Sequence, residues 1–323
     1  MSDREEKTGK NDNGKKNKGG KRNKIVAIEM IILVLMIMAA VAIFIQKDKS
    51  VKEAAKIHNQ KAKKTEQTPQ AAQKENEIEE ETEGTEEETG DRDASVPDRS
   101  NFAVQPGVSV GTTEQSDEKI VYLTLDDGPS DNTQAVLDIL DKYNAKATFF
   151  VTGEMPEYKD MIKAAYDKGH TIGMHTYSHD YAKVYASVDA YFQDLDQIGQ
   201  MVQEEIGYVP CFIRFPGGSS NTVSKKYTAG IMSTLVQEVQ NRGYQYYDWN
   251  GSSGDGSVRT TEELVAQATS FDSNNIILLC HDSHGKQTTV EALPQIVEHY
   301  QSLGYTFKAL DRDSFVAHHG VNN

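Results

Sequence analysis

The chain has 323 residues, 37% of them hydrophobic, and a formal net charge of −15. This hydrophobic share is low for a compact protein of that length, so we expect part of the chain to lie outside the folded domain. No basic segment is interleaved with aromatic residues, which argues against nucleic-acid binding. The two cysteines, Cys211 and Cys280, cannot build a disulfide framework. Each lies in an apolar run, so we predict two buried thiols, with a single bridge as the alternative.

The first predicted element is a membrane-spanning helix over residues 25–45. These 21 residues are apolar apart from Glu29, and a helix of that length spans roughly 30 Å, the thickness of a bilayer core. Residues 1–24 carry nine bases and four acids. The positive-inside rule therefore predicts a single-pass cell-membrane protein with a cytoplasmic N-terminus and an extracellular remainder. A cleaved signal peptide, with residues 40–42 at its cleavage site, is the alternative.

A polar linker that is poor in aromatic residues follows over residues 46–118. Within it, residues 75–93 hold eleven acids and one base. The negative net charge therefore belongs mostly to this segment and says little about a binding surface. Such a composition cannot bury enough apolar surface to offset chain entropy, so we predict a disordered acidic stalk.

Residues 119–315 are predicted to form one α/β domain. Short apolar runs alternate there with helix-like stretches, which is typical of parallel β/α units. The domain is short for eight full units, so we expect an irregular (β/α)7–8 barrel. A flat doubly wound sheet is the alternative, and the absence of a GxGxxG motif weakens its nucleotide-binding form. The runs predicted as strands are residues 120–125, 147–151, 171–174, 212–215, 244–247, 276–279 and 305–310.

Helix boundaries are also marked in this region. Four helix-like stretches run into a glycine, which is the residue expected in the left-handed cap of a helix. Pro156 and Thr260 are predicted helix starts. The four predicted cap glycines are Gly169, Gly207, Gly243 and Gly304.

Polar residues gather where the predicted strands end, the place where α/β active sites are built. Asp126 and Asp127 directly follow an apolar strand. Because neighbouring side chains at a strand end diverge, one carboxylate can bind a metal while the other handles protons. A simple Asp-Gly-Pro turn is the alternative. His175 and His179 are four residues apart, and we place them on one face of a helical turn, a spacing common in metal sites. With one carboxylate they form a metal site that stays open to water and substrate.

Three further clusters hold residues that could take part in catalysis or substrate binding. Arg214 lies in an apolar run and needs an anionic partner, either a catalytic carboxylate or a structural ion pair, because an unpaired buried charge is very costly. Gly217 permits close approach of the backbone to a ligand. Trp249 is the only tryptophan of the chain and suits either sugar stacking or packing. A buried strand ends at His281, the residue type that usually serves as general acid near neutral pH.

In order, the motifs TLDDGP, HTYSH, RFPGG, DWNGSSGD and LLCH resemble the five motif blocks of the polysaccharide deacetylases. This family is also called the NodB-homology family or carbohydrate esterase family 4. The resemblance covers about residues 119–312. Leu125 stands where phenylalanine is usual, and Gly217 stands where many members have tyrosine. A backbone donor survives that change, so it affects the expected substrate contacts more than the expected catalysis.

The resemblance implies metal-dependent hydrolysis of N-acetyl groups from a polysaccharide, with release of acetate. Peptidoglycan N-acetylglucosamine is the expected substrate. A chitin-like oligosaccharide, O-acetyl xylan and a catalytically silent glycan-binding module are the alternatives. The expected cofactor is one divalent ion, Zn²⁺, with Co²⁺ or Mn²⁺ as alternatives.

The resemblance also implies a role for each of ten residues. Three would bind the metal: Asp127, His175 and His179. Four would carry or tune proton transfer: Asp126 as the base, Arg214 as its orienting partner, His281 as the acid and Asp255 as the residue that tunes it. Three would contact substrate: Gly217 through its backbone N–H, and Trp249 and Leu279 as walls of the acetyl pocket.

Overall fold

The computed structural model describes residues 99–322 of the chain. The predicted cytoplasmic segment 1–24 and the predicted span 25–45 lie outside this range, as does most of the predicted linker. None of the helices between residues 99 and 322 could span a bilayer. The last predicted linker residues, 99–118, contact the domain: Phe102 and Val110 are buried, and the N–H of Cys211 donates to the carbonyl of Phe102. The packed region therefore includes residues 99–118, which the sequence analysis places in the linker.

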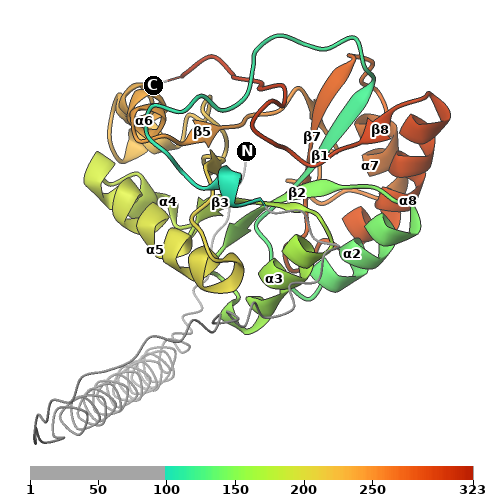
Figure 1. Ribbon diagram of the computed structural model, residues 1–323, viewed down its shortest axis with the longest axis horizontal. Coiled ribbons are helices and arrows are strands. Elements are labelled where there is room, and N and C mark those ends of the chain that lie inside the picture. Colours follow the sequence, from blue (N-terminus) through green and yellow to red (C-terminus); the bar gives the residue numbers. More distant parts are fainter. Residues whose placement is uncertain (1–98, 323) are drawn as a thin grey trace, which may run out of the picture. The chain divides into compact units, whose positions relative to one another are not determined.

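The described region alternates strands and helices (Figure 1). The strands are β1 (Ile120–Asp126), β2 (Ala147–Thr152), β3 (Thr171–Thr176), β4 (Phe212–Ile213), β5 (Gln245–Tyr246), β6 (Gly251–Ser252), β7 (Asn275–His281) and β8 (Thr306–Phe307). The helices are α2 (Thr133–Lys142), α3 (Asp160–Asp167), α4 (Tyr181–Val184), α5 (Val188–Ile206), α6 (Ile231–Asn241), α7 (Thr261–Ala268) and α8 (Gln287–Ser302). The 3₁₀ turns are η1 (Ser100–Phe102), η2 (Pro156–Tyr158) and η3 (Ser224–Lys226). All seven predicted strands are present, and only the short β6 was not predicted.

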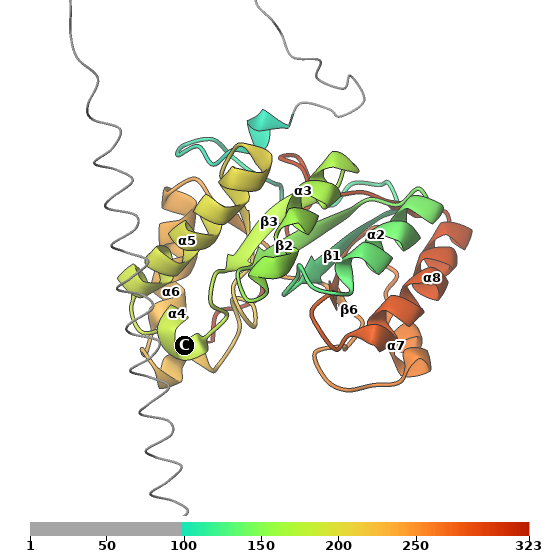
Figure 2. The ribbon, with the colours of Figure 1, turned by 90° about the horizontal axis from the view of Figure 1, so that it is seen from below.

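The strands form one parallel sheet in the order β5-β4-β3-β2-β1-β7-β6, with β8 paired to the start of β1. The two ends of this path, β5 and β6, are not paired with each other. The sheet is therefore a parallel half-barrel, which is consistent with the irregular barrel that the sequence predicts. Helices cover its outer face (Figure 2). Residues 247–250 join β5 to β6 across the open side, and the N–H of Asp248 donates to the carbonyl of Ala317 there.

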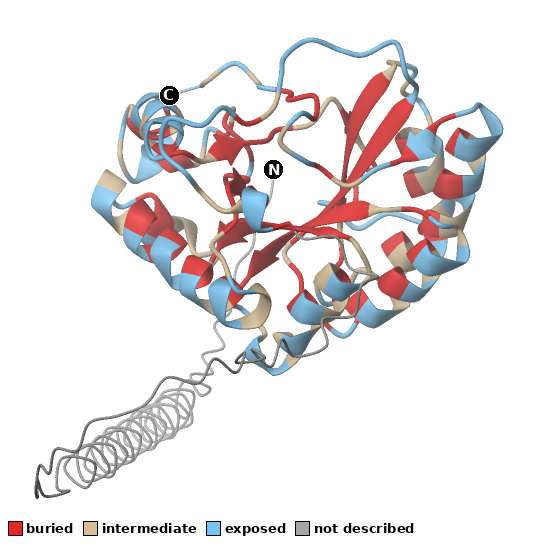
Figure 3. Cartoon of the chain, viewed as in Figure 1, coloured by how far each residue is buried: buried red, intermediate tan, exposed pale blue. Residues whose placement is uncertain are grey.

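Side chains alternate between the two faces of each strand, and this alternation decides where the polar residues point. One set packs against the helices: Val121, Leu123 and Leu125 in β1, and Ile276, Leu278 and Cys280 in β7. The other set packs inside the half-barrel: Ile120 and Tyr122 in β1, and Ile277 in β7. The same alternation, followed to the ends of β1 and β7, points the side chains of Asp126 and His281 toward the inside of the half-barrel. Figure 3 shows the strands as the most continuously buried part of the domain.

The predicted helix boundaries are confirmed. All four predicted cap glycines have positive φ angles just beyond a helix. Thr260 caps α7 through a capping box with Glu263, and Pro156 begins η2.

Cys211 and Cys280 are free and buried, as predicted.

His170, directly before β3, carries a pH-dependent part of the stability. Its side chain is fully buried, and Nδ1 accepts a hydrogen bond from the N–H of Ala147. Burial, with help from nearby cations such as Lys146, lowers the pKa of His170 to about 3. In the unfolded chain the pKa is about 6.5, so the unfolded state binds the extra proton first as the pH falls.

We therefore expect the free energy of unfolding to be highest above about pH 6.5 and to fall by about 2 kcal/mol toward about pH 5 through this residue. His170→Gln keeps an acceptor for Ala147 and should remove most of this slope in urea unfolding. The matched control is His299→Gln, on the partly exposed face of α8. An unchanged slope in His170→Gln would show that another group controls the acid transition.

Candidate metal centre and catalytic site

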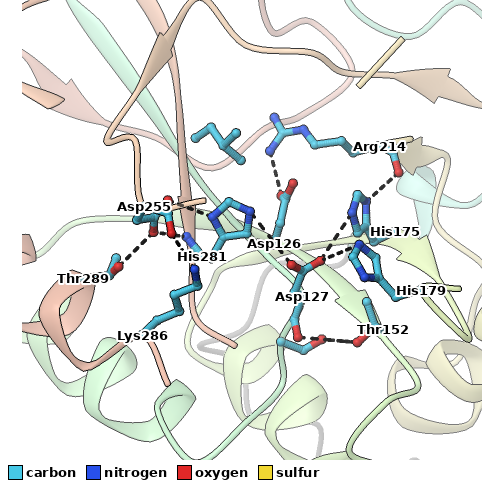
Figure 4. A network of polar contacts seen from close by, with 12 residues as sticks. Asp126, Asp127, Thr152, His175, His179, Arg214, Asp255, His281, Lys286 and Thr289 are labelled. Atoms are coloured by element: carbon cyan, nitrogen blue, oxygen red, sulfur yellow. Dashed lines mark hydrogen bonds and ion pairs between the residues drawn. The ribbon is translucent and has the colours of Figure 1, made fainter. Parts of the chain in front are cut away.

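The two carboxylates at the end of β1 diverge, as the sequence predicted. Asp126 is the last strand residue and lies opposite His281 in the register of β1 with β7. Asp127 follows with a φ of 67°, a left-handed conformation that non-glycine residues rarely adopt. This turn sends its carboxylate toward β3, where it lies near the two histidines (Figure 4). Gly128 comes next, where an added Cβ would lie 2.3 Å from the buried carboxylate of Asp282.

The two histidines approach Asp127 from β3 and the loop after it. The Nε2 atoms of His175 and His179 lie 3.4 Å and 3.3 Å from Asp127 Oδ1. The predicted helical turn is wrong: His175 belongs to β3, and His179 follows a tight loop with a φ of 46°. The rings stack with centroids 5.2 Å apart because this loop folds back on the strand. Two of the three non-glycine residues with positive φ between residues 99 and 322 are thus predicted metal ligands, a placement typical of functional sites.

This cluster fits a divalent metal. Two atoms that each lie about 2.0–2.1 Å from a tetrahedral ion lie roughly 3.3–3.4 Å apart, which matches both Asp127–histidine distances. Asp127 Oδ1 is buried and has no hydrogen-bond partner in the described region, which is expected of an atom that binds a metal ion. His175 Nδ1 lies 2.7 Å from the carbonyl of Arg214, which can only accept, so Nε2 faces the site. No other group of three such residues in the described range could hold a metal ion.

The charges of the cluster are arranged for metal binding. Burial acts to raise the pKa of the Asp127 carboxyl, but the imidazoles of His175, His179 and His281 outweigh it, and the pKa lies below its ordinary value. Burial also lowers the pKa of His175 despite the neighbouring carboxylates. An ionised carboxylate and a neutral imidazole are the forms that bind a metal.

Arg214 lies just after β4 and is fully buried. Its Nη1 donates to Asp126 Oδ1 and to Thr124 Oγ1, both at 2.7 Å. Its Nε donates to the carbonyl of Tyr247 at 2.8 Å, and the guanidinium lies 4.3 Å from the ring centre of Phe150. The predicted anionic partner is therefore Asp126. These contacts fix Oδ1 of Asp126 and leave Oδ2 without a hydrogen bond from residues 99–322.

His281 is held by the residue predicted to tune it. Its Nδ1 lies 2.8 Å from Asp255 Oδ1, and its backbone N–H donates to Asp255 Oδ2 at 2.8 Å. Thr289 also donates to Asp255 Oδ2, at 2.9 Å. Burial acts to lower the pKa of His281, but the hydrogen bond and charge of Asp255 outweigh it and raise the pKa to about 9. His281 Nε2 lies 3.9 Å from Asp127 Oδ2, so it points into the same site (Figure 4).

The three predicted substrate-binding residues border this site. Gly217 is exposed and has a φ of 74°; an added Cβ would lie 2.8 Å from Tyr181 Oη. The Trp249 ring is partly exposed, and its centre lies 5.7 Å from the Arg214 guanidinium. Leu279 precedes His281 by two residues in β7, so both side chains face the same side of the sheet. The Tyr181 hydroxyl explains why a larger side chain at position 217 does not fit here.

Asp194, in α5, is a supporting residue that the sequence did not reveal. Its carboxylate accepts from the N–H groups of Tyr177 and Ser178 and from the Ser178 hydroxyl, at 2.5 to 3.3 Å. These groups belong to the loop between the two histidines, so Asp194 holds that loop in place. A buried aspartate on an apolar helix face is the one signal that could have indicated it.

We expect Asp194→Asn to lower the affinity for Zn²⁺ by about 10- to 100-fold, the usual effect of losing a residue that supports metal ligands. The amide would turn an N–H toward backbone donors and release the loop. Isothermal titration of the metal-free protein measures this directly. Asp196→Asn, an exposed change on the same helix, is the matched control, and equal affinities in the two variants would contradict the role.

Known proteins resemble this chain in sequence and in fold. The family profile described as polysaccharide deacetylase matches residues 113–236. The catalytic domain of a peptidoglycan N-acetylglucosamine deacetylase from Eubacterium rectale is 46% identical, with a TM-score of 0.63; the match covers 65% of this chain and 97% of that one. A polysaccharide deacetylase from Bacillus cereus is 30% identical, with a TM-score of 0.53, and the match covers 64% and 97%. This chain belongs to the polysaccharide deacetylase family, whose members hydrolyse acetyl groups on polysaccharides and depend on a metal.

A sequence relative agrees with these structures. A peptidoglycan-N-acetylglucosamine deacetylase from Bacillus cereus is 29% identical over 226 residues, which cover 65% of this chain and 78% of that protein. The predicted family is therefore confirmed.

Proposed function

We propose that this protein removes acetyl groups from N-acetylglucosamine residues of peptidoglycan and uses Zn²⁺ to do so. The observation that carries the proposal is the meeting of three side chains, Asp127, His175 and His179, beside an Asp126–Arg214 pair and a His281–Asp255 pair. The relatives named as peptidoglycan-N-acetylglucosamine deacetylases support the choice of substrate. The spacing of the ligand atoms supports a small tetrahedral ion.

The chain's own groups have separable roles in this proposal. A bound divalent ion would polarise the acetyl oxygen and lower the pKa of water. Asp126, held by Arg214 through one oxygen, accepts the proton of the attacking water with the other. His281, with Nδ1 held by Asp255, donates a proton from Nε2 to the departing sugar amine. The backbone N–H of Gly217 donates to the oxygen that becomes negative.

The test is acetate release by the purified full-length protein. Purified peptidoglycan, N-acetylglucosamine oligomers and O-acetylated xylan are compared, each with Zn²⁺, Co²⁺ or Mn²⁺ added to metal-free protein. We expect acetate from peptidoglycan, with free amines on glucosamine residues in mass spectra of the digest. Acetate from xylan alone would replace the substrate, and no acetate with any of the metals would overturn the proposal.

We also propose that residues 25–45 anchor the protein in the cell membrane with the catalytic domain outside. The apolar run and its basic flank support this placement. Protease added to intact cells should remove the catalytic domain, whereas protection until lysis would contradict an extracellular location.

A further inference from the structure

Tyr181 begins α4 two residues after His179, and its ring is fixed between two parts of the site. The ring centre lies 5.8 Å from that of His179 and 5.5 Å from that of Tyr185, both in edge-on contacts. Tyr185 is buried, and its hydroxyl donates to the carbonyl of Pro216 at 2.8 Å. Tyr181 is thus wedged between a predicted metal ligand and the loop that carries Gly217.

The hydroxyl of Tyr181 reaches the backbone of Gly217. A Cβ added at Gly217 would lie 2.8 Å from Tyr181 Oη and 3.1 Å from Asn221 Cβ. Position 217 excludes a side chain for two reasons. Its positive φ angle would strain any residue other than glycine, and the Tyr181 hydroxyl fills the space that a side chain would need. The proposed oxyanion donor and this hydroxyl therefore lie next to each other.

The Tyr181 hydroxyl has no hydrogen-bond partner in residues 99–322, unlike the hydroxyl of Tyr185. Its side chain is half-buried rather than sealed in the core. A phenol is a donor at neutral pH. The hydroxyl is therefore able to donate to water or to a substrate oxygen that enters the site.

We propose that Tyr181 is a catalytic residue whose hydroxyl donates a hydrogen bond to the acetyl oxygen as that oxygen gains negative charge. It acts beside the backbone N–H of Gly217, and the role rests on the deacetylase function proposed above. Since the donor is prepositioned by its ring contacts, it favours the charged transition state more than the neutral substrate.

Tyr181→Phe removes only the hydroxyl and is the direct test. We expect kcat for N-acetylglucosamine oligomers to fall by about 10- to 100-fold with little change in KM, because a donor to developing charge acts mainly in the transition state. Zn²⁺ affinity and the melting temperature should stay as in the unchanged protein. The matched control is Tyr143→Phe, which removes an exposed hydroxyl bound to Glu298 at the end of α2. A kcat within twofold of the control, or a loss explained by lower Zn²⁺ affinity, would overturn the proposal.

Acetate binding tests the same donor without turnover. Acetate offers a negatively charged oxygen, so its affinity for the Zn²⁺-loaded protein should fall by about 10-fold in Tyr181→Phe. If the unchanged protein releases no acetate from any substrate, the deacetylase function fails, while equal acetate affinity in the two proteins rejects the role of Tyr181 itself. Gly217→Ala should lower the melting temperature less in the Tyr181→Phe background, because the clash with Oη is gone. Equal losses in both backgrounds would contradict the contact.

Discussion

Replacing Asp127 with alanine is expected to lower turnover by on the order of 10³-fold or more and to abolish tight Zn²⁺ binding. The ion would lose the one carboxylate among its three predicted ligands in the described region. The Lewis-acid contribution of such an ion is worth several kcal/mol. The metal-free variant should unfold near the temperature of the metal-free parent. The reason is that Asp127 Oδ1 accepts no hydrogen bond in the described region, so the change breaks none there.

The measurement is a pair of melting curves with and without Zn²⁺, together with acetate release. At a free metal concentration 100 times Kd, the parent gains about 2.7 kcal/mol of stability, and Asp127→Ala should gain almost none. Asp138→Ala, an exposed change on α2, should keep both the activity and the metal-dependent gain. A similar gain in Asp127→Ala would show that the ion binds elsewhere.

Asp126→Asn should lower kcat by about 10²- to 10⁴-fold, the contribution of a positioned general base, while Zn²⁺ affinity stays within a few-fold. The amide oxygen of asparagine can still accept the hydrogen bond from Arg214, so the end of β1 should keep its place. What is lost is the proton acceptor, and added metal cannot restore it. Retained activity would assign the base elsewhere.

The same change should also destabilise the protein. Arg214 is fully buried, and Asp126 is the one carboxylate paired with it in the described chain. Removing one partner of a buried pair costs about 3–5 kcal/mol, and asparagine should show the lower part of that range because it keeps an acceptor. Urea unfolding measures this cost. Asp126→Ala, which removes the acceptor as well, should be less stable than Asp126→Asn, and the reverse order would contradict the proposed contact.

Much of the site could be predicted because the end of an apolar strand is a local feature of the sequence. Asp126 and Asp127 directly follow the apolar run from Ile120 to Leu125, so their place at a strand end, where α/β active sites are built, follows from the sequence alone. The same reasoning places His281 at the end of β7. Arg214 needed a partner because an arginine in an apolar run is costly, and the structure supplies Asp126 at 2.7 Å.

The prediction of a helical turn at His175 and His179 was wrong because residue spacing alone does not distinguish a helix from a tight loop. Histidines four positions apart can lie on one face of a helix, but they can also lie at a strand end and on the far side of a tight loop. Asp194, fifteen residues later on α5, decides between these by binding the loop backbone. The packed segment 99–118 and the residues that cross the open side of the half-barrel were equally hidden, since they depend on surfaces of distant elements.

The family, the alternation of strands and helices, and the chemical groups at the strand ends follow from the amino-acid sequence alone, because hydrophobic periodicity, helix caps and motifs are properties of neighbouring residues. Three features depend on tertiary contacts: the open edge between β5 and β6, the support that Asp194 gives to the metal ligands, and the Tyr181 hydroxyl in the space at Gly217. Those contacts join residues far apart in the chain, and their geometry is set by how helices pack on the sheet.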